Sequence, residues 1–147
     1  FLSITRANEW SLTPSFSFVV THRQSNSQSK VTVLDTGLIT FEPINKDSTK
    51  DIVLSCGVHG NETAPIEICN TLVSNILNLE LTTNHRVLFI FANLDAMVIA
   101  ERFVEENLNR LFNKDIMSTT SEGILANNIM HTVDSFFESA KAEKNTL

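Results

Sequence analysis

The sequence has no run of lysine and arginine residues, and its 17 acidic residues outnumber its 11 basic ones. Nucleic-acid-binding proteins need clustered positive charge to displace counterions from the phosphates. A formal net charge of -6 and a pI near 5.1 therefore argue against a nucleic-acid partner. No glycine-rich phosphate loop follows either of the two most apolar segments, which argues against a nucleotide-binding protein as well.

Long apolar stretches and paired cysteine motifs are also missing. Apolar runs such as residues 87–92 are far too short to span a bilayer, and the first residues lack the regions of a signal peptide. Cys56 and Cys69 match no CxxC motif and have apolar neighbours, so we interpret them as reduced core residues. We expect a cytoplasmic protein without a membrane segment, in which 147 residues with 42% hydrophobic content build one globular unit.

The first fifty residues alternate short apolar runs with polar turns. Residues 16–20, 31–34 and 38–41 have the composition of strands. We interpret the polar stretch 24–29 as a hairpin loop rather than a linker. These runs predict antiparallel strands along one side of a sheet.

From Asp51 onwards, strand and helix patterns alternate. Residues 52–56 and 87–92 are nearly continuous apolar runs, as in strands covered on both faces. Pro65 suits the first turn of a helix. The apolar stripe of this helix would be formed by Ile66, Cys69, Val73, Ile76 and Leu77.

Two further helices are expected in the second half. Residues 95–106 have helical composition, and apolar residues from Leu125 to Ala140 follow a helical period, with Ser121 as a possible N-cap. The expected fold class is α/β: a mixed, mainly parallel sheet flanked by helices, with antiparallel N-terminal strands.

Residues 56–65, CGVHGNETAP, form the most informative segment. They lie between a predicted buried strand and the following helix, where α/β proteins place active sites. His59 and Glu62 are three residues apart, and imidazole and carboxylate are both normal zinc ligands. Because catalytic zinc has three protein ligands and an open position for water, this pair would supply two of three. The alternative is a structural turn in which Glu62 caps the helix amides.

The run GVHGNETAPIE, residues 57–67, resembles the zinc-binding signature of the succinylglutamate desuccinylase/aspartoacylase family, whose fold is similar to that of zinc carboxypeptidases. Residues 63–65, Thr-Ala-Pro, resemble the desuccinylase form of this signature in particular. Residues 35–43 resemble the strand region ahead of the metal loop. Asn93 ends the next strand as in the family, and Leu94 stands where the family usually has Pro.

A second resemblance concerns the substrate-binding segment. In the family an Arg is followed seven residues later by Asn-Arg, a spacing reproduced by Arg102, Asn109 and Arg110. The resemblance implies that Asn109 and Arg110 bind the α-carboxylate of the substrate, as guanidinium and amide groups can. It implies that Arg102 polarises the scissile carbonyl and stabilises the oxyanion. The alternative is that both arginines pair with neighbouring glutamates on a solvated helix face.

The implied reaction is zinc-dependent hydrolysis of N-succinyl-L-glutamate to succinate and L-glutamate, in arginine catabolism by the succinyltransferase pathway, with one Zn²⁺ per active site. The family's third ligand, a His, and its general acid/base, a Glu, belong to downstream motifs that have no counterpart before Leu147. We therefore interpret residues 1–147 as the N-terminal part of a zinc amidohydrolase catalytic domain, inactive alone. The alternatives are an aspartoacylase-like deacylase of another N-acyl amino acid and a non-catalytic α/β binding domain.

The other histidines and the cysteines carry no comparable signal. His22, His85 and His131 are interpreted as surface or packing residues. Cys56 has no neighbouring pattern that would activate a thiolate, so it is not expected to be a nucleophile.

Overall fold

The computed structural model describes residues 15–22, 26–44, 50–113 and 118–144. Five strands are formed: β1 (Phe16–Thr21), β2 (Gln28–Asp35), β3 (Leu38–Ile44), β4 (Asp51–Cys56) and β5 (Arg86–Phe91). The helical elements are α2 (Thr63–Leu77), α3 (Leu94–Val98), the 3₁₀ helix η1 (Leu108–Arg110) and α4 (Ser121–Lys144). The strands expected from residues 16–20, 31–34, 38–41, 52–56 and 87–92 are thus confirmed, with small shifts at their ends.

The strands form one mixed sheet in the order β1-β2-β3-β5-β4. Strands β1, β2 and β3 are antiparallel neighbours, which confirms the N-terminal antiparallel strands. Of the loop expected over residues 24–29, residues 24 and 25 lie outside the described residues, and Gln28 and Ser29 belong to β2. Strand β5 pairs antiparallel with β3 and parallel with β4. The α/β class with flanking helices is therefore confirmed, but the expectation of a mainly parallel sheet is wrong for the described residues, where one of four strand pairs is parallel.

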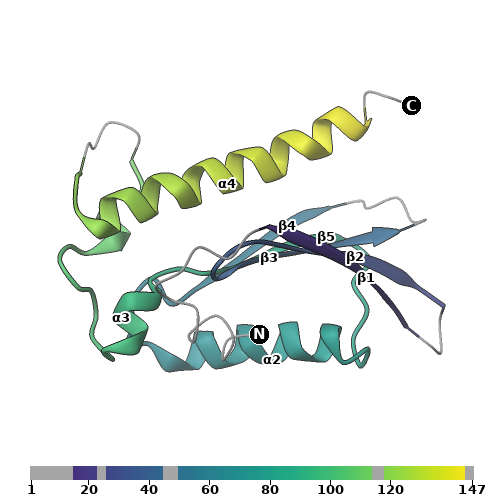
Figure 1. Ribbon diagram of the computed structural model, residues 1–147, viewed down its shortest axis with the longest axis horizontal. Coiled ribbons are helices and arrows are strands. Elements are labelled where there is room, and N and C mark those ends of the chain that lie inside the picture. The colour runs from purple at the N-terminus through teal and green to yellow at the C-terminus, as the bar shows by residue number, and fades with distance from the viewer. Residues whose placement is uncertain (1–14, 23–25, 45–49, 114–117, 145–147) are drawn as a thin grey trace.

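Helices cover both faces of the sheet, with α2 on one side and α4 on the other (Figure 1). Strand β5 explains this layering, because its side chains alternate between two buried clusters. Val87, Phe89 and Phe91 face the cluster that contains α2 residues. Leu88 and Ile90 face the cluster that contains α4 residues. A strand buried on both faces is continuously apolar, as the sequence indicated.

The predicted apolar stripe of α2 is confirmed: Ile66, Cys69, Val73 and Ile76 are buried against the sheet. Cys69 meets the other cysteine, Cys56, in this cluster, and both are free thiols. The interpretation of the cysteines as reduced core residues is confirmed.

The helix expected over residues 95–106 is wrong beyond its first turn. Helix α3 ends at Val98, where the Glu101 N–H donates back to the Ala96 carbonyl at 3.0 Å and Ala100 adopts a left-handed φ of 55°. The chain then runs without regular structure to η1. Residues 104–106 have helical composition, but their N–H groups bond to the distant Glu122 carboxylate instead of to a helix.

The last helix is confirmed as α4, but its cap differs from the expectation. Ser121 is already the first helical residue. The hydroxyl oxygen of Thr120 accepts a hydrogen bond from the Gly123 N–H at 3.1 Å, so Thr120 performs the capping that was expected of Ser121.

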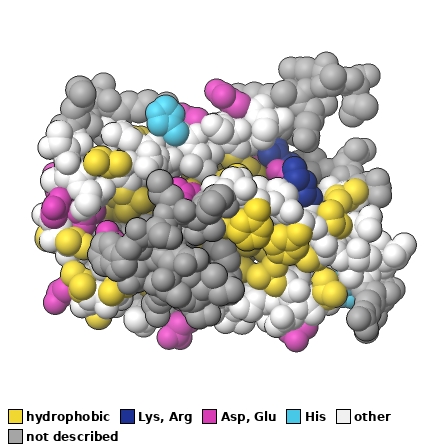
Figure 2. All heavy atoms as spheres, viewed as in Figure 1, with side chains coloured by type: hydrophobic (Ala, Val, Ile, Leu, Met, Phe, Trp, Pro, Cys, Tyr) yellow, Lys and Arg dark blue, Asp and Glu magenta, His cyan; other side chains and the backbone are white. Residues whose placement is uncertain are grey.

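Strand β1 forms one edge of the sheet and leaves large apolar side chains in solvent. Phe16, Phe18 and Val19 are 49%, 40% and 52% exposed. Figure 2 shows exposed hydrophobic side chains gathered on the face of the molecule that is turned toward the viewer. In the described part of the chain, no helix is long and apolar enough to cross a membrane.

Candidate active site

The loop that carries the His59 motif joins the carboxyl end of β4 to the start of α2. Backbone hydrogen bonds fix its beginning against the end of β5: the Asn93 N–H donates to the Gly57 carbonyl at 2.9 Å, one residue beyond the parallel ladder. Gly57 has a left-handed φ of 65°, which lets the chain turn. Gly60 packs directly on α3, where an added Cβ would lie 2.1 Å from the Ala96 carbonyl carbon. Gly57 therefore lets the chain turn, and Gly60 lets the loop backbone contact α3, which fixes the position of the loop.

His59 and Glu62 meet at the end of this loop. The His59 Nδ1 lies 2.8 Å from the Glu62 Oε1. His59 is 6% exposed, whereas the Glu62 side chain is 52% exposed. Glu62 occupies the N-cap position of α2, yet its carboxylate makes no capping hydrogen bond. The alternative in which Glu62 caps the helix amides is therefore wrong.

Asn107 holds the other side of the His59 ring. Its carboxamide oxygen lies 3.1 Å from the His59 Nε2 and also accepts a hydrogen bond from the Asn109 N–H at 3.1 Å. The two ring nitrogens of His59 thus each face an acceptor oxygen, Nδ1 that of Glu62 and Nε2 that of Asn107. No local pattern in the sequence marks Asn107, because its contact with His59 spans 48 residues.

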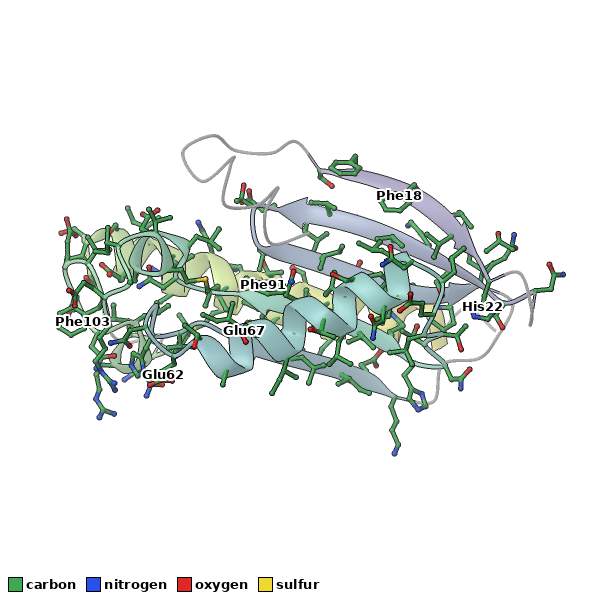
Figure 3. The ribbon with its side chains drawn as sticks, turned by 90° about the horizontal axis from the view of Figure 1, so that it is seen from below. Phe18, His22, Glu62, Glu67, Phe91 and Phe103 are labelled. Carbon is green, nitrogen blue, oxygen red and sulfur yellow. The ribbon has the colours of Figure 1, made fainter. Side chains whose placement is uncertain are left out.

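Arg102 approaches the same carboxylate. Its Nη1 lies 3.5 Å from the Glu62 Oε1, and the guanidinium-bearing side chain is 51% exposed. The structure thus brings His59, Glu62 and Arg102 together, and Arg102 pairs with Glu62 rather than with a neighbouring glutamate. Figure 3 shows Glu62 and Phe103, the residue after Arg102, at the same end of the molecule.

Asn109 and Arg110 follow Asn107 in η1 with exposed side chains. Within the described residues, neither side chain has a hydrogen bond or ion pair to His59 or Glu62. The two residues therefore lie beside the site, with their polar groups free of contacts to the His59 and Glu62 side chains.

A buried carboxylate, Glu122, lies behind the site and was not assigned a role from the sequence. It is 1% exposed and accepts a hydrogen bond from the Asn93 amide at 3.2 Å. Burial by itself raises the pKa of this carboxyl. The N–H groups of Val104 and Glu105, the Asn93 amide and the Ser121 hydroxyl outweigh burial and hold the pKa below its ordinary value.

The residues present fit part of a zinc site. The described residues contain no group of three His, Cys, Asp and Glu side chains that could hold a metal ion. The His59 and Glu62 atoms that face each other are an imidazole nitrogen and a carboxylate oxygen, both atom types that bind zinc. The contact of the far ring nitrogen with the Asn107 carboxamide oxygen is the kind of support that metal-binding histidines commonly have.

In the described part of the chain, the printed partners of His59 and Glu62 include no other histidine and no cysteine. His22 is at the opposite end of the molecule from Glu62 (Figure 3). Burial and the neighbouring Cys69 raise the pKa of the Cys56 thiol far above its ordinary value, so Cys56 is not an activated nucleophile.

Curated relatives match the whole chain. Succinylglutamate desuccinylases from Shewanella pealeana and Shewanella piezotolerans are 42% and 43% identical to it over 151 aligned residues. Each alignment covers 100% of this chain and 42% of the relative. The chain therefore spans about two-fifths of the length of the relatives it matches.

Solved structures agree with this match. The succinylglutamate desuccinylase from Vibrio parahaemolyticus superposes with a TM-score of 0.81 at 29% identity, over 92% of this chain and 44% of that chain. The enzyme from Vibrio cholerae gives a TM-score of 0.73 at 33% identity, over 82% and 35%. The family model described as the succinylglutamate desuccinylase/aspartoacylase catalytic domain matches residues 48–147. With the loop that carries His59 and Glu62 and the Arg102 segment in the arrangement described above, the chain belongs to the succinylglutamate desuccinylase/aspartoacylase family.

Proposed function

We propose that this chain forms the N-terminal part of a zinc-dependent amidohydrolase that cleaves N-succinyl-L-glutamate into succinate and L-glutamate. The observation that carries the proposal is the 2.8 Å contact of His59 Nδ1 with Glu62 Oε1, with Arg102 on the same oxygen. The names of the relatives support the choice of substrate. A place in arginine catabolism and a cytoplasmic location belong to the same proposal.

His59, through Nδ1, and Glu62 would hold the zinc ion, with a third ligand from outside these 147 residues. When bound, zinc supplies a Lewis acid that polarises the amide carbonyl and lowers the pKa of a water molecule. With Nδ1 as the ligand atom, the imidazole hydrogen would be on Nε2, where the Asn107 carboxamide oxygen would accept it and orient the ring. Burial of His59 at 6% exposure restricts the ring further, whereas the exposed Glu62 leaves the site open to substrate.

The substrate would lie along the segment from Arg102 to Arg110. Arg102 would donate to the carbonyl oxygen of the scissile amide as negative charge develops there. Asn109 and Arg110 would bind the α-carboxylate of the glutamate portion, and their exposed side chains leave the donors accessible. A glutamate outside this chain would take the proton from the attacking water and return it to the leaving amine.

The test uses the full-length protein and four variants. His59→Ala and Glu62→Ala remove the proposed ligands, and His131→Ala and Glu67→Ala are matched controls. Glu67 lies on α2 with an exposed side chain (Figure 3), and His131 lies exposed on α4. Zinc is measured by elemental analysis and turnover by succinate release. We expect one zinc ion per chain and measurable turnover in the unaltered protein and the controls, and loss of both in the two ligand variants.

The same assay addresses the alternatives. An aspartoacylase-like deacylase would release acetate from N-acetyl-L-aspartate faster than succinate from N-succinyl-L-glutamate. A non-catalytic binding domain would contain no zinc and cleave neither substrate. The 147-residue chain alone is expected to hold zinc weakly, because two ligands do not complete a catalytic site, and to be inactive.

A further inference from the structure

Three consecutive backbone N–H groups converge on the carboxylate of Glu122. The Val104 N–H donates to Oε1 at 2.7 Å, the Glu105 N–H lies 3.3 Å from both oxygens, and the Glu106 N–H donates to Oε2 at 3.4 Å. Successive N–H groups of this kind form an anion-binding concavity, which is here filled by a side chain of the same protein. The Ser121 hydroxyl adds a donor to Oε2 at 3.0 Å.

The segment held in this way carries Arg102 two residues before Val104. Residues 101–105 are all exposed, with Phe103 at 40% and Val104 at 45%, so apolar packing does little to fix them. The N-terminal end of the segment, next to α3, is fixed by the hydrogen bond from the Glu101 N–H to the Ala96 carbonyl at 3.0 Å. Arg102 itself contributes a single ion pair at 3.5 Å between half-exposed groups, which is a weak constraint. The Glu122 carboxylate is thus the strongest described constraint on the backbone that presents Arg102.

The Asn107 end of the segment has an anchor of its own. The next residue, Leu108, is completely buried in the cluster on the α4 side of the sheet. Asn107 also caps η1 through the Asn109 N–H. Glu122 therefore has less influence on the contact between Asn107 and His59 than on the position of Arg102.

We propose that Glu122 is a positioning residue for Arg102: its buried carboxylate fixes the backbone of residues 104–106 so that the guanidinium faces the substrate carbonyl. This inference rests on the proposed function, because it assigns Arg102 to the reaction. Glu122 contacts neither substrate nor metal ligands and acts through the backbone.

Replacing Glu122 with glutamine tests this role, since it keeps the shape of the side chain. One acceptor oxygen becomes an NH₂ group that would face N–H donors, so part-buried donors lose their partner and the segment loosens. In the full-length protein we expect kcat to fall roughly 10- to 100-fold, the range expected when a stabilising donor is displaced by about an ångström. Zinc content should stay at one ion per chain, because His59, Glu62 and Asn107 keep their contacts.

The matched control is Glu138→Gln, an exposed glutamate on the same helix α4. It should leave kcat, zinc content and thermal stability unchanged. A Glu122→Gln protein with the kcat of the unaltered enzyme would overturn the proposal. Loss of zinc together with activity would also overturn it, because Glu122 would then support the metal loop rather than Arg102.

A double-mutant cycle separates positioning from a general structural role. Glu122→Gln is measured alone and in an Arg102→Ala background. If Glu122 acts through Arg102, the second substitution should lower kcat by less than about threefold once Arg102 is gone, because residues that act as a unit are not additive. Equal losses in both backgrounds would contradict the proposal.

Two further measurements cover the remaining outcomes. If Glu122→Gln does not fold, Glu122→Asp keeps the charge but withdraws the carboxylate by one methylene, and this variant is measured in the same double-mutant cycle.

If the unaltered protein cleaves no N-succinyl-L-glutamate, the proposed function fails, and amide hydrogen exchange then tests whether Glu122 positions the segment. Glu122→Gln should then speed exchange at Val104 and Glu105 about tenfold and leave Leu108 unchanged; unchanged exchange at Val104 would overturn it.

Discussion

The carboxamide oxygen of Asn107 lies 3.1 Å from Nε2 of His59, on the side of the ring opposite Glu62. This contact links η1 to the loop after β4 and holds the His59 ring with Nδ1 on the side of Glu62. It joins the proposed substrate-binding segment to the proposed metal ligands.

Asn107→Ala should weaken zinc binding by the full-length protein about 10- to 100-fold, the usual effect of removing a hydrogen-bond partner behind a metal ligand. Asn107→Asp keeps an acceptor oxygen and should retain most of the affinity. Competition with a chelator of known affinity measures both. Asn128→Ala, at an exposed position of α4, is the control. Equal affinity in Asn107→Ala and the control would refute the role given to Asn107.

Gly60→Ala should displace the loop that carries His59 and Glu62. The added Cβ would lie 2.1 Å from the Ala96 carbonyl carbon and 2.2 Å from its oxygen, and backbone cannot move aside as a flexible side chain can. We expect a loss of about 1–3 kcal/mol in the free energy of unfolding, typical of overpacking, together with weaker zinc binding. Denaturant unfolding and zinc titration measure the two effects. Asn61→Ala, at the exposed next position, should change neither appreciably.

Arg86 should be a major stabilising residue away from the site. Its side chain is 7% exposed, lies 3.1 Å from Asp51, donates to the Phe136 carbonyl at 3.2 Å and stacks on the Phe136 ring. Arg86→Met leaves Asp51 without this partner and should cost about 3 kcal/mol of unfolding free energy. Adding Asp51→Asn should recover part of the loss. Lys30→Met, which removes an exposed cation on β2, should cost far less.

The stability contributed by Glu122 should depend on pH. Its folded-state pKa is lowered, so the carboxylate contributes stability that is fully present above the unfolded-state pKa of about 4.3. That contribution is lost as the pH falls through the folded-state pKa. The difference in unfolding free energy between the unaltered protein and Glu122→Gln should therefore be largest near neutral pH and shrink below about pH 4. A difference that grows on acidification would contradict this assignment.

The sequence predicted the parts of the fold that depend on local patterns. Residues 52–56 and 87–92 were identifiable as strands because burial on both faces leaves a continuous apolar run. The stripe from Ile66 to Ile76 marked α2, and the glycines around His59 marked the turn between them. The pairing of His59 with Glu62 followed from the same local turn.

What the sequence could not show depends on contacts between distant residues. The segment 95–106 has helical composition, but its N–H groups bond to Glu122, which is 18 residues after Val104. The strand order places β5 between β3 and β4, and this choice makes the sheet mostly antiparallel. Asn107 is 48 residues from His59, so its role could be seen only in the folded chain.

The most direct test of the central claim is ¹⁵N NMR of the His59 ring in the full-length protein, with and without zinc. His59→Gln identifies its signals. We predict that the Nδ1 resonance shifts to the value of a coordinated nitrogen when one equivalent of zinc is added, and that Nε2 then carries the ring hydrogen, which the Asn107 carboxamide oxygen accepts. A His59 ring whose two nitrogen resonances do not respond to zinc would contradict the assignment of this loop as a metal site.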